Sequence, residues 1–280
     1  MRQLTVMTFN LWRGGEAADA DREASRAQTL AVLEATGADV FGLQETDRRS
    51  TLYADRLGLC HVDQGGGRSI MSRLEVVAVA PHGFGVAVRL PGGGIAHVFN
   101  VHPTHRPYQP YQLAGIPYQG GHIIHGAAEA IEEARKARGA EIAALIAALR
   151  PVLAGGEPVF LTGDFNEPSH LDWTARAADA GVCPLAVAWP SSSALAAAGM
   201  RDAYRSVFSD EVRRPGHTWT SRPAPREVPD RIDRVYFAGA GVSPLHAAVV
   251  GEERAHADVV ITPWPSDHRA MLATFELGRR

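Results

Sequence analysis

The stretch 159–168 places two polar side chains directly after an apolar run of strand length. The run ends at Gly163, and Asp164 and Asn166 follow at alternate positions before Pro168. Side chains two apart on an extended segment point to the same side, so we expect a carboxylate and a carboxamide to leave the end of a buried strand together. A carboxylate there can orient water or accept its proton, and an amide can donate to a phosphate-like oxygen. Taken alone, the same residues are also typical of a turn.

Other predicted strands also end in polar residues. These residues are Asn10, Glu45, His102, Asp267 and His268. Carboxylate and amide oxygens with water suit Mg²⁺ or Mn²⁺, whereas zinc normally takes more histidine or cysteine. Phosphoryl transfer needs positioning, a metal ion against developing charge, and proton transfer. The set therefore contains the residue types that a metal-dependent phosphoryl-transfer site needs.

One more carboxylate, Asp233, lies inside the otherwise apolar strand 231–237. A buried carboxylate is costly unless it is paired, so Asp233 needs a partner, and a histidine is the obvious one. The histidines at positions 97, 217, 246 and 256 follow no such pattern and are treated as ordinary.

The chain around these groups predicts a strand, a helix and a strand, followed by a series of strands. Residues 4–9 and 40–43 are strand-like, and residues 24–34 between them have helical spacing that Gly37 ends. Further strands are expected at 69–73, 76–80, 84–90, 95–101 and 271–275. The tight turns between residues 76 and 101 favour an antiparallel arrangement there.

An amphipathic helix is predicted over 127–149, with Pro151 ending it. Acidic residues of the same helix are interleaved with its basic residues Arg135, Lys136 and Arg138. This pattern is typical of a solvated helix face rather than a nucleic-acid patch.

The loop 103–125 follows His102 and carries tyrosines, histidines and prolines. A loop of this length in a compact domain is usually a functional lid or a disordered excursion. We weigh a substrate-facing loop equally against a proline-rich surface flap. The candidates for substrate selection are His105, Arg106, Tyr118, His170 and Trp219.

Length and composition set the general class. A chain of 280 residues with no composition break predicts one catalytic domain over 1–280. The net charge of -3 shows no excess of positive charge that would bind the phosphate backbone of a nucleic acid, which makes a nuclease less expected. Two distant cysteines indicate unpaired thiols in a reducing compartment, although a disulfide between them stays open. No signal peptide or transmembrane segment is recognisable, so we expect a soluble cytoplasmic protein.

Seven of these short motifs, in this order, resemble the endonuclease/exonuclease/phosphatase superfamily, which includes DNase I, abasic-site endonucleases of the exonuclease III type, neutral sphingomyelinases and inositol-polyphosphate 5-phosphatases. The motifs are Thr8-Phe9-Asn10, Gln44-Glu45, the strand 69–73, Asn100-Val101-His102, Gly163-Asp164-Phe165-Asn166, Arg231-Ile232-Asp233 and Ser266-Asp267-His268. The resemblance covers nearly the whole chain. It implies an α/β fold, a four-layer α/β/β/α sandwich of two mixed β-sheets with helices outside.

The resemblance also implies a metal centre and a water-activating group. Glu45 is similar to the family's main metal ligand, with Asn10 and Asp267 beside the same ion. Asp164 resembles the residue that orients or deprotonates the attacking water.

The remaining motif residues are similar to groups that handle the phosphate. Asn166 resembles a donor to the scissile phosphate, and His268 resembles the histidine that stabilises the phosphoryl oxygens. Asp233 is similar to the carboxylate that fixes the tautomer of that imidazole. His102 resembles the histidine of the DNase I and phosphatase branches, where abasic-site endonucleases typically carry a tyrosine.

The sequence thus predicts a phosphoesterase dependent on Mg²⁺ or Mn²⁺ that cleaves a P–O bond by in-line attack of an activated water. The lack of a basic stripe and the long loop 103–125 favour a small or lipid-derived phosphodiester or phosphomonoester as substrate. The first alternative is a nuclease of the DNase I or exonuclease III kind. The second is a catalytically dead binding module, which would be expected to lack Glu45, Asp164 or His268, all of which are present. The oligomeric state and the number of metal ions stay open.

Overall fold

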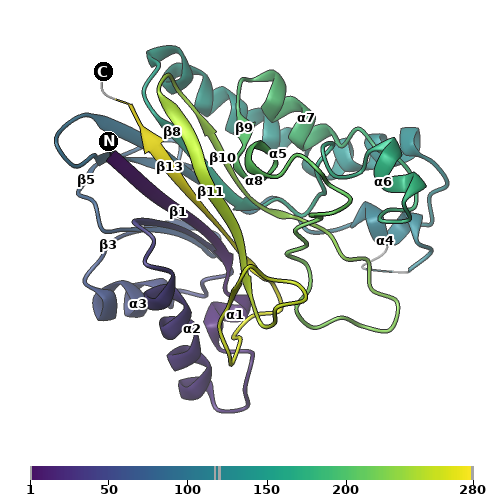
Figure 1. The fold of residues 1–280 in the computed structure, drawn as a ribbon, viewed down its shortest axis with the longest axis horizontal. Helices are drawn as coiled ribbons and strands as arrows, with labels where there is room; N and C mark the ends of the chain where they lie inside the picture. Colours follow the sequence, from purple (N-terminus) through teal and green to yellow (C-terminus); the bar gives the residue numbers. More distant parts are fainter. Residues whose placement is uncertain (1, 117, 119–120, 279–280) are drawn as a thin grey trace.

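A computed structural model describes residues 2–116, 118 and 121–278. Two mixed β-sheets pack face to face, and helices cover their outer faces (Figure 1). This arrangement confirms the predicted four-layer sandwich. Residues 117, 119 and 120 of the predicted loop 103–125 lie outside the described part of the chain.

The first sheet has seven strands in the order β12-β11-β13-β1-β2-β4-β3. Its strands are β1 (Arg2–Asn10), β2 (Val40–Gln44), β3 (Cys60–Gly65), β4 (Arg68–Ser72), β11 (Val242–Gly251), β12 (Val259–Val260) and β13 (Ala270–Leu277). Strands β1 and β2 are parallel, and β13 runs antiparallel to β1. The carboxyl ends of β1 and β2 therefore lie at one edge of the sheet, together with Asn10 and Glu45.

The second sheet has six strands in the order β5-β6-β7-β8-β10-β9. Its strands are β5 (Val76–Val79), β6 (Gly85–Arg89), β7 (Ile95–Val101), β8 (Val159–Asp164), β9 (Arg201–Asp202) and β10 (Asp233–Ala238). The expected antiparallel arrangement of β5, β6 and β7 is confirmed, whereas β7 and β8 are parallel. The parallel pair brings His102 and Asp164 to the same edge of this sheet.

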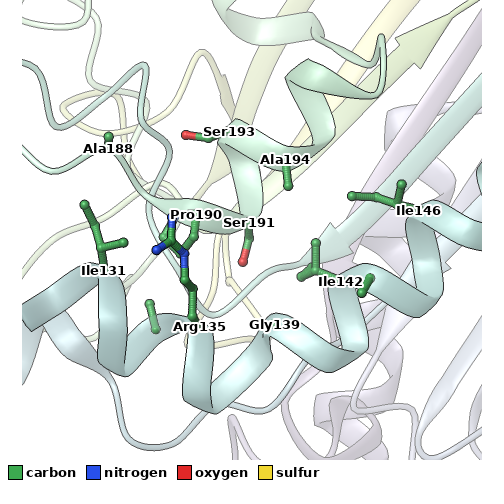
Figure 2. A pocket seen from close by; sticks show the side chains of 12 residues that line it. Ile131, Arg135, Gly139, Ile142, Ile146, Ala188, Pro190, Ser191, Ser193 and Ala194 are labelled. Carbon is green, nitrogen blue, oxygen red and sulfur yellow. The ribbon is translucent and has the colours of Figure 1, made fainter. Parts of the chain in front are cut away.

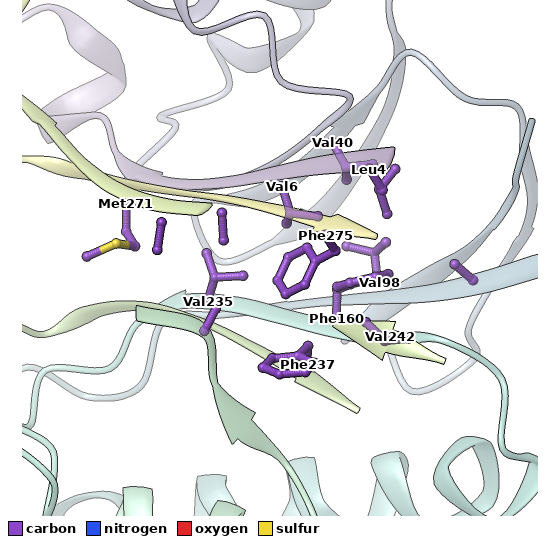
Figure 3. Close-up of a cluster of buried hydrophobic side chains, with 14 of the residues drawn as sticks. Leu4, Val6, Val40, Val98, Phe160, Val235, Phe237, Val242, Met271 and Phe275 are labelled. Atoms are coloured by element: carbon purple, nitrogen blue, oxygen red, sulfur yellow. The ribbon is translucent and has the colours of Figure 1, made fainter. Parts of the chain in front are cut away.

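Alternate side chains of the strands fill the space between the two sheets. Leu4 and Val6 of β1 lie across from Val98 of β7 and Phe160 of β8, with Phe275 of β13 in the same layer (Figure 3). All five side chains are buried. Because successive residues of a strand point to opposite faces, every second position of these strands belongs to this central core.

Helices pack on the outer faces of both sheets. They are α1 (Trp12–Gly15), α2 (Arg22–Thr36), α3 (Ser50–Leu57), α4 (Gln109–Leu113), α5 (Ala127–Gly155), α6 (Ala175–Asp179), α7 (Pro190–Ala197) and α8 (Ala203–Val207). On the first sheet, Val32 of α2 and Tyr53 of α3 pack with Phe41. On the second, Leu149 of α5 packs with Leu161. Figure 1 shows α2 and α3 on one side of the sheets and α5 with α7 on the other.

The prediction that Pro151 ends the long helix is wrong. Helix α5 continues through Pro151 to Gly155 and is capped by Gly156 with φ of 71°. A proline inside a helix removes one backbone hydrogen bond. Here Leu149, Val152 and Leu153 pack against the second sheet on both sides of the proline, and this packing outweighs the loss. The predicted end of α2 at Gly37 is confirmed, with φ of 60° at that residue.

Candidate active site

The candidate residues continue the inward faces of the central strands. Along β1, Leu4 and Val6 of the central core are followed on the same face by Thr8 and Asn10. The same alternation leads from Val98 to Asn100 and His102 along β7, and from Phe160 to Thr162 and Asp164 along β8. The layer between the sheets therefore changes from apolar to polar toward the carboxyl ends of the strands.

A buried belt of hydrogen bonds forms the floor of the site. The Nε2 of Gln44 donates to Asn100 Oδ1 at 2.7 Å and to Thr8 Oγ1 at 3.0 Å. The hydroxyl of Thr162 donates to the same Asn100 oxygen at 3.1 Å. Gly42 lets the two sheets approach here, because a Cβ atom at this position would lie 1.9 Å from Thr162 Oγ1. The belt fixes the strand ends that carry the candidate residues.

Above the belt, His268 lies between two carboxylates. Its Nδ1 is 2.9 Å from Asp233 Oδ2, and its Nε2 is 3.7 Å from Asp164 Oδ2. The histidine partner that the sequence predicts for Asp233 is thus His268. Burial works against a charged imidazole, but the two carboxylates raise the pKa of His268 to about 10. The ring is therefore an imidazolium at neutral pH.

Asp164 also contacts the second histidine, His102. The two side chains approach to 3.4 Å between Nε2 and Oδ2. Despite its burial, Asp164 has a pKa well below its ordinary value because His268 and His102 lie beside it. Burial lowers the pKa of His102, but the Asp164 carboxylate outweighs this effect and raises it. Asp164 is therefore an ionised acceptor, only 1 % exposed, between two potential cations.

Possible ligand atoms of Asp164, Asp233 and His268 lie within 4.8 Å of one another. A metal ligand must be deprotonated, whereas His268 is held as a cation by these same carboxylates. The ion pairs within the group therefore account for its geometry.

Two further carboxylates, Glu45 and Asp267, lie beside this group. Asn10 Nδ2 donates to Glu45 Oε1 at 3.1 Å and to Asp164 Oδ2 at 2.9 Å, and its Oδ1 accepts from the Trp12 N–H at 3.0 Å. Within the described part of the chain, the buried Oδ1 of Asp267 has no hydrogen-bond partner. Burial and the nearby Glu45 charge raise the pKa of Asp267 to about 6, although the His268 cation opposes this. A cation beside Asp267 would satisfy both its charge and its unpartnered oxygen.

A left-handed turn of the backbone holds Glu45. All four residues of α1 have positive φ, from 53° at Trp12 to 74° at Gly15, and Glu45 itself has φ of 49°. Non-glycine residues in this region are strained. The turn directs the Gly14 N–H to the Glu45 carbonyl at 2.6 Å and the Arg13 N–H to Glu45 Oε2 at 3.3 Å. The strained segment thus orients both the backbone and the side chain of Glu45.

Asn166 reaches the site by a different geometry from the one predicted. Its φ of 50° is left-handed, so the chain is not extended between Asp164 and Asn166. Its backbone N–H donates to Asp164 Oδ1 at 3.0 Å, and its Nδ2 donates to the carbonyl of Pro103 at 3.1 Å. Both side chains nevertheless line the same cleft. The two interpretations of Asp164 and Asn166, as a turn and as a pair of side chains facing the substrate, are therefore compatible.

Part of the candidate set opens into a cleft of about 240 Å³, whereas Asn10, His102 and Asp233 are not among the described residues that line it. Its polar lining includes Glu45, Asp164, Asn166, Asp267 and His268. Its aromatic lining consists of Trp12, Tyr108, Tyr111, Tyr118 and Trp219. Of the residues predicted to select the substrate, His105, Tyr118 and Trp219 line the cleft. Arg106 and His170 are not among its lining residues, and His170 Nδ1 instead pairs with Ser192 at 2.8 Å.

The aromatic lining is fixed by two carboxylates that the sequence analysis misses. Tyr108 donates to Asp230 Oδ2 at 2.7 Å, and both Tyr111 and the indole of Trp219 donate to Glu227 Oε1, at 2.5 and 3.1 Å. These bonds join the loop 103–125 to the segment before β10. An acidic residue directly before a buried strand is the only signal that could have pointed to Asp230.

The prediction that Arg138 lies on a solvated face is also wrong. Arg138 is fully buried, and its Nε donates to Glu167 Oε2 at 3.1 Å. Its terminal nitrogens donate to the carbonyl of Thr104 at 3.2 Å, to that of Pro107 at 3.4 Å and to the side chain of Gln109. Arg138 thus joins the start of the loop 103–125 to Glu167, the residue that follows Asn166.

A larger cavity of about 550 Å³ lies elsewhere, between α5 and α7 (Figure 2). Ile131, Ile142 and Ile146 of α5 line it, together with Arg135 and Pro190. Among the described residues, no carboxylate or histidine lines this cavity, so it lacks the groups for phosphoryl chemistry. The carboxylates Glu45, Asp164 and Asp267 line the smaller cleft instead.

Comparison with known proteins identifies the family of this chain. The model of the Endonuclease/Exonuclease/phosphatase family matches residues 7–268. The chain belongs to this family. Members of the Endonuclease/Exonuclease/phosphatase family are generally hydrolases that act on phosphoesters.

Three similar proteins illustrate how far the likeness to this family extends. A Caenorhabditis elegans protein described only as uncharacterized is 24% identical and covers 97% of this chain and 91% of its own length. Truncated TDP2 from Caenorhabditis elegans has a TM-score of 0.58 and 20% identity, with 98% of both chains covered. A family member from Bacteroides vulgatus has a TM-score of 0.62 and 16% identity, covering 99% of this chain and all of that one (100%). At these identities the solved structures show the shared fold.

Two further expectations concern the chain as a whole. No helix among the described residues is long and apolar enough to cross a membrane. Cys60 and Cys183 are both free, as the simpler interpretation of the sequence predicts.

Proposed function

We propose that residues 1–280 form one catalytic domain that hydrolyses a P–O bond of a small or lipid-derived phosphodiester or phosphomonoester with the help of a divalent metal ion. The observation that carries this proposal is the convergence in one cleft of an ionised Asp164, a cationic His268 and the unpartnered carboxylate oxygen of Asp267. These three groups supply a water acceptor, a charge for phosphoryl oxygens and a place for a metal ion.

In this proposal Asp164 receives the attacking water. An ionised carboxylate accepts a hydrogen bond from water and orients it, and it can take up the proton as the water attacks. The contact with Asn10 at 2.9 Å leaves the orientation of the Asp164 carboxylate fixed. Because its pKa is low, orientation of the water is the larger part of its role.

The two histidines act on the phosphate. The imidazolium of His268 donates to phosphoryl oxygens as negative charge develops on them, and Asp233 keeps the ring oriented. His102, whose pKa is raised by Asp164, holds a proton for the leaving oxygen. Asn166 lines the cleft and has a second amide hydrogen, beyond the one directed at Pro103, that can donate to the substrate.

The metal ion in this proposal is Mg²⁺ or Mn²⁺, held by Glu45 and Asp267. Hard carboxylate oxygens without a cysteine or a neutral histidine favour these ions. When bound, such an ion neutralises charge on the phosphoryl group. The sequence predicts Asn10 as a third ligand, and that role stays a prediction. In the structure its amide NH₂ group faces the carboxylates and its oxygen accepts from the Trp12 N–H.

The size and lining of the cleft support a small substrate. A cleft of about 240 Å³ with tyrosine and tryptophan side chains fits the apolar part of a small ester better than a nucleic-acid duplex. The net charge of -3 points the same way. A nuclease is the second candidate, because the family takes part of its name from endonucleases and exonucleases.

The proposal is tested by hydrolysis with metal-stripped protein, before and after addition of Mg²⁺ or Mn²⁺. A chromogenic phosphodiester, a phosphomonoester and supercoiled plasmid are compared side by side. Metal-dependent turnover of a small ester with intact plasmid is the expected result. Metal-dependent nicking of the plasmid without ester turnover would instead support a nuclease. Ester turnover unaffected by metal removal would show that the reaction needs no divalent metal ion.

A further inference from the structure

A second polar pocket, of about 210 Å³, lies outside the catalytic cleft. It is formed by the segments 213–217 and 254–258, next to Val249 of β11. Three arginines, Arg213, Arg214 and Arg254, line it together with His217 and His256, and Asp258 is the one carboxylate in its lining.

The acidic group of this pocket is already neutralised. Asp258 Oδ1 pairs with Arg214 Nη2 at 2.5 Å, and its Oδ2 accepts the backbone N–H of Val249 at 2.9 Å. The guanidinium of Arg214 also stacks on the ring of Phe208, 4.2 Å from its centroid. This pair joins the two segments and leaves the other two arginines without a matching charge inside the pocket.

The remaining cations are weakly paired. Arg213 is 3.9 Å from Asp210, which Arg176 already holds at 2.8 Å. The side chain of Arg254 has no hydrogen bond or ion pair to any residue that the structure describes. Glu253, the residue beside it, is instead 3.4 Å from His256. The pocket therefore has an excess of positive charge at its walls.

His217 adds a neutral donor. Its side chain is half-buried and makes no hydrogen bond within the described residues. Burial, together with the Arg269 and Arg205 cations, lowers its pKa to about 4. A neutral imidazole offers one N–H donor and one acceptor, so it can bind a group that carries both oxygen acceptors and a proton.

We infer that this pocket binds inorganic phosphate or a similar oxyanion between Arg213 and Arg254, with His217 as a further donor. Guanidinium groups bind such oxyanions in forked geometry, and the weakly paired Arg213 together with Arg254 supplies the charge. A volume of about 210 Å³ holds such a group with several waters but no folded segment. The inference is independent of the catalytic proposal, since none of these residues lines the cleft.

The pocket is close to the catalytic site along the chain. His217 is followed by Thr218, whose hydroxyl accepts the N–H of Asp233 at 3.0 Å, and then by Trp219, which lines the cleft. Arg269, next to His268, donates to the carbonyl of His217 at 3.2 Å. His217 of the pocket and Trp219 of the cleft are thus two positions apart in the chain, so phosphate binding has to be measured separately from turnover.

The test is isothermal titration of the full chain with inorganic phosphate. The R213A/R254A variant removes the two exposed arginines of the pocket, and R22A/R150A removes two exposed arginines on α2 and α5 as a charge-matched control. We expect the pocket variant to lose at least about tenfold in phosphate affinity at one site, while the control keeps the wild-type isotherm.

Ester hydrolysis in phosphate-free buffer separates this inference from the catalytic proposal. The R213A/R254A variant should hydrolyse the ester at the wild-type rate, since neither arginine lines the cleft. Equal isotherms for wild type and R213A/R254A would overturn the inference, as would the absence of phosphate binding to the wild type. An equal loss in R22A/R150A would also overturn it, because the effect would then be one of net charge.

Discussion

His268 Nδ1 lies 2.9 Å from Asp233 Oδ2, at the polar end of the layer between the two sheets. Asp233 comes from the first residue of β10 and His268 from the segment before β13, so the contact crosses from one sheet to the other. The carboxylate fixes which nitrogen of the ring faces Asp164. The orientation of the His268 ring toward Asp164 therefore depends on how the two sheets pack.

The D233N variant should lower kcat roughly 10- to 100-fold, because His268 loses both its orientation and its stabilised charge. In an H268Q background the same substitution should cost little more, since its effect acts through the ring. Rates of ester hydrolysis for the two single variants and the double variant give the coupling. Effects that simply add would show that Asp233 and His268 act separately.

Asp230 gives the protein a predictable pH dependence. Burial raises the pKa of Asp230 to about 8, in spite of hydrogen bonds from Tyr108 and Trp173. Between about pH 4 and 8 the folded state holds a proton that the unfolded state has lost, so the free energy of unfolding falls as pH rises through this window. Urea unfolding at several pH values should show a smaller fall for D230N than for wild type. A variant at the exposed Asp55, D55N, serves as control, and parallel curves for D230N and wild type would contradict the prediction.

Removing the guanidinium of Arg138 should be costly. The R138M variant leaves Glu167 as a buried, uncompensated charge, which costs about 3–5 kcal/mol of unfolding free energy. It also releases the carbonyls of Thr104 and Pro107, so KM should rise where the fold survives. The double variant R138M/E167Q should recover part of the stability in urea unfolding. No recovery would mean that the arginine stabilises the loop by packing alone.

The close approach at Gly42 can be tested directly. The G42A variant places a methyl group 1.9 Å from Thr162 Oγ1, and the resulting shift should destabilise the protein by about 1–3 kcal/mol or more. The G42A/T162A variant removes the clashing hydroxyl and should regain part of this loss. Thermal unfolding measures both, with G139A as control, because a Cβ at Gly139 meets only Arg135 Cβ at 3.8 Å.

Strand periodicity explains why much of the site is predictable from the sequence. Asn10, His102 and Asp164 continue the inward alternation of apolar strands, and a buried carboxylate at Asp233 requires a partner of opposite charge. Such patterns are local, so they can be recognised without knowing the fold. Strand β11 is missed because Pro244 and a shift of register interrupt its pattern.

The parts that sequence patterns do not reveal depend on contacts between distant residues. Tyr108 and Asp230 are separated by 122 positions, and nothing in either segment identifies the other. Arg138 has the sequence surroundings of a solvated helix face, and only the position of Glu167 makes its burial favourable. Asn166 is left-handed because its N–H turns back to Asp164. The residue types of this segment indicate such a turn, but they do not show that both side chains still line one cleft.

Turnover of the D164N variant shows whether Asp164 activates the attacking water. Asparagine has nearly the same shape as aspartate, but its NH₂ group cannot accept the hydrogen bond that Asn10 or the Asn166 N–H donates to Asp164. Circular dichroism therefore first establishes that D164N is folded. With saturating Mg²⁺ or Mn²⁺ and a small phosphoester, we expect kcat to fall by at least about 100-fold, because the water loses its charged acceptor. A folded D164N variant that hydrolyses the ester at the wild-type rate would show that Asp164 does not activate the attacking water.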